Sequence, residues 1–140
     1  MNNFWVNAHG GSTHFPIALL FASLLFDVAG FTLHRRKIMS RDLHMAAFYA
    51  ILLGALATFA AVLSGLIISN WQFAGAGTLA RHHLFVWPAF GLIVGLAAWR
   101  LLVREKASRP AYGGYLLMSL VATVFMLAAG YWGGELLLGG

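Results

Sequence analysis

The chain has 140 residues, of which 61% are hydrophobic and only 9% are charged, and its mean hydropathy is +0.80. A soluble domain carries charge on about a quarter of its residues, so this composition excludes an ordinary soluble domain and predicts an integral membrane protein. The net charge of +5 would indicate nucleic acid in a soluble protein. Here the basic residues flank apolar segments, so we expect the lipid bilayer as a partner and no nucleic acid.

Four apolar segments predict membrane-spanning helices, because crossing about 30 Å of hydrocarbon takes roughly 20 helical residues. They lie at about 14–33, 45–69, 83–103 and 112–132, and they lack the alternation that is typical of strands. The connectors are short, which makes consecutive helices antiparallel. We therefore predict an all-α, up-down-up-down four-helix bundle that forms a single transmembrane domain over residues 1–140.

The basic residues gather on one side of the predicted membrane. Eight of the nine lie in or beside the first and third connectors: Arg35, Arg36, Lys37, Arg41, Arg100, Arg104, Lys106 and Arg109. Only Arg81 lies in the second connector. Basic loops stay in the cytoplasm, so we expect a bacterial inner-membrane protein with both termini on the outer, periplasmic side. No basic segment precedes the first apolar segment, so we expect it to stay as a span and not to be a cleaved signal peptide.

The sequence contains no cysteine, which excludes disulfides, thiolate metal sites and cysteine-attached haem. Any metal or haem must therefore be held by His, Met, Tyr or carboxylate side chains. Phosphate-binding glycine-rich loops, nucleophile triads and paired catalytic carboxylates are not found in the sequence. We therefore assign no catalytic residue and expect an electron-transfer or accessory subunit instead of a self-sufficient enzyme.

The predicted topology brings polar side chains from all four spans to the outer face. These residues are His9, His14, Asn70, Arg81, His82, His83 and Glu135. Two opposed imidazoles can hold haem iron, and three can bind a transition-metal ion. His82 and His83 differ by about 100° around a helix, so we expect one of them to face the bundle. We favour His83, because it shares its face with Phe90 and Gly91, as in a helix contact.

Each of these residues also has a simpler interpretation. Interfacial histidines can lie among lipid headgroups and water at little cost. Glu135 is either a partner that orients a histidine, a proton acceptor, or a solvated terminal acid. Arg81 either pairs with a haem propionate or extends along the membrane surface. For His14 and His83 together we favour the ligand role.

Asp27 lies about two-thirds of the way through the first span, where a carboxylate is unfavourable unless it is paired or functional. It is about 220° around the helix from His14, so it does not extend the same site. We favour pairing with a Ser, a Thr or a basic residue near the cytoplasmic face over a proton relay. His34 and His44 flank the basic connector, and we interpret them as solvated loop histidines, with a second ligand pair as the alternative.

Five stretches of the sequence together carry a recognisable pattern: His9-x4-His14-Phe-Pro-Ile-Ala-Leu-Leu, Leu25-Phe26-Asp27, Leu63-Ser-Gly65, Ala80-Arg-His-His83 and Gly130-Tyr-Trp-Gly-Gly-Glu135-Leu. The pattern covers most of the chain and resembles the predicted membrane proteins grouped as domain of unknown function 2231. This resemblance implies a four-span bundle. Because members sometimes occur beside redox domains, it also implies electron transfer. Many relatives have a further histidine after Gly-Gly-Glu, so a site that needs that histidine would be incomplete here.

Three hypotheses follow. In the first, the chain is a haem b redox subunit with His14 and His83 as axial ligands, Arg81 near the propionates and Glu135 beside a ligand. In the second, it binds copper, zinc or iron without porphyrin, through histidines among His9, His14, His82 and His83. In the third, it is a structural subunit whose histidines are merely interfacial. Short loops leave little surface outside lipid, so we expect a membrane-protein or redox partner.

Overall fold

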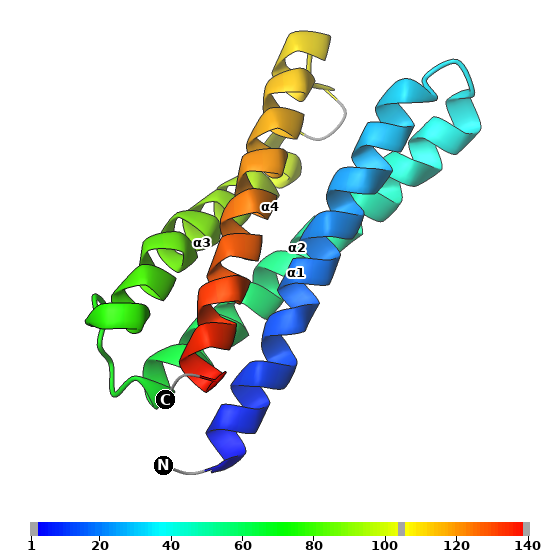
Figure 1. Ribbon diagram of the computed structural model, residues 1–140. Helices are drawn as coiled ribbons and strands as arrows, with labels where there is room; N and C mark the ends of the chain where they lie inside the picture. Colours follow the sequence, from blue (N-terminus) through cyan, green and yellow to red (C-terminus); the bar gives the residue numbers. More distant parts are fainter. Residues whose placement is uncertain (1–2, 104–105, 139–140) are drawn as a thin grey trace.

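The computed structural model describes residues 3–103 and 106–138, and within these ranges it contains helices and no strands (Figure 1). The helices are α1 (Asn3–Thr32), α2 (Lys37–Ile68), α3 (Gly77–Val103) and α4 (Arg109–Leu138). Each is long and apolar enough to cross a membrane. The predicted all-α bundle of four spans is therefore confirmed.

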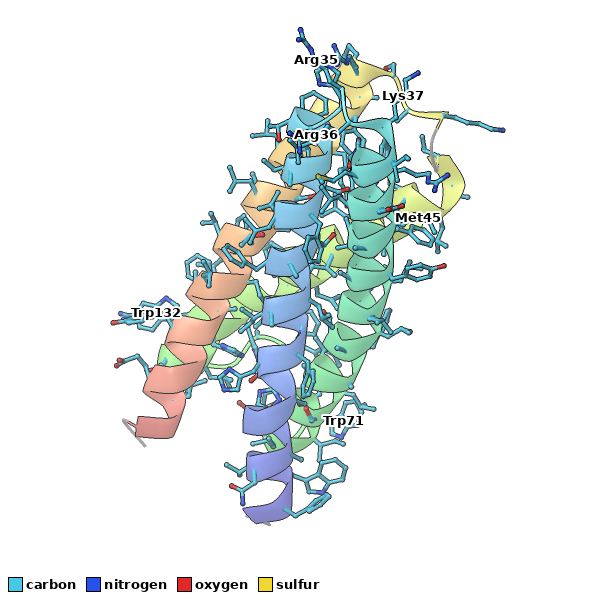
Figure 2. The ribbon with its side chains drawn as sticks, turned by 90° about the vertical axis from the view of Figure 1, so that its right-hand side faces the viewer. Arg35, Arg36, Lys37, Met45, Trp71 and Trp132 are labelled. Carbon is cyan, nitrogen blue, oxygen red and sulfur yellow. The ribbon has the colours of Figure 1, made fainter. Side chains whose placement is uncertain are left out.

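The two ends of the bundle differ in character. The start of α1 and the end of α4 lie at one end, together with the α2–α3 connector, which we call the terminal end (Figure 1). Arg35, Arg36 and Lys37 mark the opposite end, the basic end, whereas Trp71 and Trp132 lie in the terminal half (Figure 2). The basic connector between α1 and α2 thus lies at the opposite end of the bundle from the start of α1 and the end of α4, as the predicted topology requires.

The bundle consists of two helical hairpins. α1 packs mainly against α2, and α3 packs mainly against α4, whereas the hairpins meet each other over a smaller surface. Buried alanines such as Ala47, Ala55, Ala89 and Ala122 let the helices approach closely, which is the usual packing device in lipid. Large apolar side chains instead cover the outside, as expected for a surface that faces hydrocarbon.

Each helix begins before its predicted span, most clearly at the N-terminus of the chain. α1 begins at Asn3 and not near residue 14, so Gly10-Gly11-Ser12-Thr13 is helical. The Ser12 and Thr13 hydroxyls donate back to the carbonyls of His9 and Gly10 at 3.1 and 3.0 Å, which satisfies them within the helix. His9 and His14 therefore share one helix and lie five residues, or about 140°, apart around it.

Candidate functional sites: a histidine layer and a buried polar cluster

His9 turns from α1 toward α2, where its Nδ1 lies 2.9 Å from the Ser64 Oγ. The Ser64 hydroxyl donates its single proton to the Ala61 carbonyl at 2.9 Å. Because that proton is committed, His9 Nδ1 must carry a proton and donate it to Ser64. In the neutral ring, Nε2 then keeps its lone pair.

His82 has the same arrangement in the second hairpin. Its Nδ1 lies 2.9 Å from the Ala129 carbonyl oxygen on α4. A carbonyl only accepts hydrogen bonds, so Nδ1 of His82 must be the donor. The lone pair of the neutral His82 ring is therefore also on Nε2.

A glycine of the neighbouring helix lies against each of these two rings. A Cβ added to Gly65 would lie 3.1 Å from His9 Cε1, and one added to Gly133 would lie 3.2 Å from His82 Cε1. The rings therefore occupy space that any other residue would partly fill. This explains two of the sequence motifs, because Leu63-Ser-Gly65 supplies the acceptor and the space for His9, and Gly130–Glu135 supplies the space for His82.

His83 is buried, with 8% of its surface exposed, and its Nδ1 has no hydrogen-bond partner in the described part of the chain. Its ring centroid lies 5.8 Å from that of His82 and 5.9 Å from that of Trp87. Its predicted inward orientation is confirmed, but His82 contacts the bundle as well. A positive charge on His82 would be repelled by one on His83 or on His9. We call His9, His82 and His83 the histidine layer.

The remaining predicted site residues lie on the outside of the helices. His14 and Glu135 are exposed, and His14 is turned away from the α2 contact that His9 makes. The Arg81 guanidinium lies 5.0 Å above the ring of Trp132 on α4. Within residues 3–103 and 106–138, no group of three or more His, Asp or Glu side chains is close enough together to hold a metal ion.

A second polar site lies in the basic half of the bundle, around the fully buried carboxylate of Asp27. Its Oδ1 accepts hydrogen bonds from His44 Nδ1 at 3.0 Å, from Arg100 Nη1 at 3.2 Å and from the Tyr112 hydroxyl. Each of the four helices supplies one of these residues, which we call the Asp27 cluster. The predicted pairing of Asp27 with a basic residue is confirmed. The interpretation of His44 as a solvated loop residue is wrong, because α2 begins at Lys37 and directs His44 toward α1.

Arg100 connects the members of the Asp27 cluster to one another. Its Nη1 donates to the Tyr112 oxygen at 3.0 Å, and its Nη2 donates to the His44 carbonyl at 2.7 Å. Its guanidinium also lies 5.4 Å from the ring centroid of Tyr115. Sequence reasoning missed Arg100 and Tyr112 as site residues. The available signal was an arginine inside the third apolar segment, which in lipid requires an acidic partner such as Asp27.

Four apolar helices with polar groups at both ends of the bundle define a small multi-pass membrane protein. The chain matches the family described as predicted membrane protein (DUF2231) over residues 6–139, and it belongs to that family. No curated protein and no solved structure matches it.

Proposed function

We propose that this chain is a membrane electron-transfer protein or redox-complex subunit that binds haem b at the terminal end of the bundle. His9 and His82 would be the two histidines that hold the haem iron. The observation that carries the proposal is the shared state of these rings, each held through Nδ1–H and each with the Nε2 lone pair free. Ligating histidines characteristically donate their second N–H to a carbonyl or another fixed acceptor, which orients the ring.

The two ligands come from different hairpins, and this suits a flat cofactor. Bis-histidine haem needs one imidazole on each face of the porphyrin. His9 belongs to the α1–α2 hairpin and His82 to the α3–α4 hairpin, so the haem would lie between the hairpins. When bound, haem supplies reversible one-electron chemistry.

The proposed pair differs from the pair predicted from the sequence, His14 and His83. His14 is exposed on α1, and a helix cannot turn both His14 and His9 toward one neighbour. His83 remains beside the site as a buried imidazole next to His82. Arg81, which is held over Trp132, is the residue we propose for a propionate.

The ligand count favours haem over a metal ion bound by protein side chains alone. Protein sites for zinc, and for copper in electron transfer, use three or more protein ligands. The part of the chain that the structure describes holds no such group, whereas haem needs only two. We propose a bacterial inner membrane with the terminal end outward, which is supported by the cluster of basic residues at the other end.

An absorption spectrum of the purified, haem-supplied protein tests this function, together with metal analysis. We expect a Soret band that shifts on reduction, lost in His9→Ala and in His82→Ala. The matched control is His14→Ala, an exposed histidine on the same helix as His9, which should keep full haem occupancy.

Each other outcome has a defined meaning. Loss of haem in His14→Ala, with retention in His9→Ala, would restore the pair predicted from the sequence. Copper, zinc or iron without porphyrin would favour the non-haem hypothesis. If well-folded, haem-supplied protein shows neither a Soret band nor a bound metal, the proposal is overturned and a structural subunit is favoured.

A further inference from the structure

The Asp27 cluster joins a fully buried acid to a partly exposed base. The Asp27 side chain has no exposed surface, whereas the His44 side chain is 30% exposed. His44 follows Lys37 by seven residues, which places it about 10 Å along α2 from the basic end. The imidazole is therefore the member of the Asp27–His44 pair that reaches the surface of the bundle.

The hydrogen bonds assign the protons within the cluster. Arg100 can only donate, so the Tyr112 oxygen accepts from Arg100 Nη1, and the Tyr112 proton remains available. That hydroxyl lies within hydrogen-bond distance of Asp27 Oδ1 and of His44 Nδ1, the second at 2.9 Å. When Asp27 is a carboxylate, Tyr112 and His44 Nδ1–H both donate to it, and His44 Nε2 keeps its lone pair.

We propose that the Asp27 cluster is a proton-exchange site that takes up one proton from the basic side of the membrane. His44 is the entry group, Asp27 is the acceptor, and Tyr112 is the hydroxyl that stabilises both states. The inference is independent of haem binding, since the Asp27 cluster lies in the opposite half of the bundle from the histidine layer.

The transfer balances without any other reactant. A hydronium ion of the aqueous phase gives a proton to His44 Nε2 and leaves as water, and the His44 Nδ1 proton passes to Asp27 Oδ1. Asp27 is then a neutral acid, and His44 is again neutral with its proton on Nε2. The Tyr112 hydroxyl turns from Oδ1 to the Nδ1 lone pair that has just formed. The net charge of the Asp27 cluster rises by one, because Asp27 becomes neutral while Arg100 keeps its positive charge.

The two carboxyl oxygens of Asp27 have different surroundings. The titratable and charged groups that face it are His44 from α2, Arg100 from α3 and Tyr112 and Tyr115 from α4. Asp27 Oδ2 is buried and accepts no hydrogen bond within the described ranges. A buried carboxylate that served only to hold the helices together, which we call a clamp, would be more stable if both of its oxygens accepted hydrogen bonds. The free oxygen therefore favours a group that changes its protonation state.

Infrared difference spectroscopy of the protein in lipid tests the proposal, because the chain has only four carboxyl side chains: Asp27, Asp42, Glu105 and Glu135. Labelling aspartate carboxyls with ¹³C separates Asp27 and Asp42 from the glutamates without any substitution. Acidifying the sample should produce a labelled protonated-acid band. This band should persist in Asp42→Asn and disappear in Asp27→Asn.

Two further variants separate proton exchange from a clamp. After a rapid pH drop, the Asp27 band should appear at least about tenfold more slowly in His44→Gln. The matched control is His34→Gln, an exposed histidine just beyond α1, which should leave the rate unchanged. Tyr112→Phe should shift the frequency of the band, because phenylalanine lacks the hydroxyl that lies against Asp27 and His44. A labelled protein without an acid band after acidification, or a band insensitive to His44→Gln and Tyr112→Phe, would overturn the proposal.

Discussion

At the residue scale, three histidine rings each lie against a glycine on an adjacent helix. The pairs are His9 with Gly65, His82 with Gly133 and His44 with Gly30. The closest approach is at Gly30, where an added Cβ would lie 2.8 Å from His44 Cε1. A glycine inside a helix normally destabilises the helix. At these three positions the glycine leaves space for the histidine ring, which a larger residue would partly fill.

Gly30→Ala should therefore destabilise the protein, although alanine is the better helix former. The methyl group would push the His44 ring away from Asp27, at a cost of about 1–3 kcal/mol. Equilibrium unfolding in mixed detergent micelles measures the change in the free energy of unfolding. Gly91→Ala is the matched control, because an added Cβ there meets nothing within 4 Å, and it should be neutral or stabilising. Equal effects in both variants would contradict this account of Gly30.

The residue scale is also where sequence reasoning reached its limit. Burial of His83 and pairing of Asp27 with a basic residue followed from helical angles and from the cost of charge in lipid. The contact of His9 with Ser64 did not, because it requires α1 to begin before His9. Tyr112 is equally hidden in the sequence, since a tyrosine near a span end is typical of an interfacial belt.

At the scale of elements, the four spans and their order were predictable from hydropathy alone. Their first residues were not, although the last residues of the first three spans were predicted to within one residue. In water, Gly10-Gly11-Ser12-Thr13 is typical of a turn, because these side chains compete with the backbone for hydrogen bonds. In a membrane the backbone groups must form their hydrogen bonds within the protein, so the same residues continue the helix. The Ser12 and Thr13 hydroxyls donate to backbone carbonyls of that helix.

The α2–α3 connector is the most irregular element. Asn70 and Trp71 have φ angles of 52° and 60°, in the left-handed region that non-glycine residues rarely adopt. The connector is fixed from α3, where the Trp87 Nε1 donates to the Phe73 carbonyl at 2.8 Å and the two rings stack at 6.0 Å. One side chain therefore holds a strained segment against the bundle.

Trp87→Phe should loosen this connector without unfolding the bundle. Phenylalanine keeps an aromatic ring but loses the donor, which removes about 1 kcal/mol of hydrogen bonding. Limited proteolysis should then cut faster between residues 69 and 77. The exposed Trp71 provides the control, since Trp71→Phe should not accelerate cleavage in the same way. Unchanged cleavage of Trp87→Phe would show that the stacking alone is sufficient.

At the scale of the whole molecule, the Asp27 cluster ties together two hairpins that otherwise share little surface. Arg100→Met should cost about 3–5 kcal/mol, because it leaves the Asp27 carboxylate without its compensating charge. Asp27→Leu combined with Arg100→Met should recover much of that loss, since neither charge remains buried. Unfolding of the single and double variants in detergent gives the free energy of unfolding of each. A double variant at least as unstable as Arg100→Met would contradict this prediction.

The orientation of the bundle gives a prediction for the intact cell. The basic end should lie in the cytoplasm, so the terminal end faces outward. Alkaline phosphatase fused after the last residue should be active, and a fluorescent protein fused there should be dark. Fusions placed after Arg36 should give the reverse pattern. The opposite result at both positions would invert the topology and put the histidine layer on the cytoplasmic side.

The pairing of Asp27 with Arg100 also has a consequence for biogenesis. The partners are 73 residues apart in the chain, so α1 emerges from the ribosome long before Arg100 is made. A lone carboxylate costs about 2.5–3.5 kcal/mol at the centre of an inserting helix. His44 is only 17 residues away from Asp27 and arrives with α2. The first hairpin can therefore enter the bilayer with its acid already hydrogen-bonded, and Arg100 completes the arrangement when the second hairpin follows.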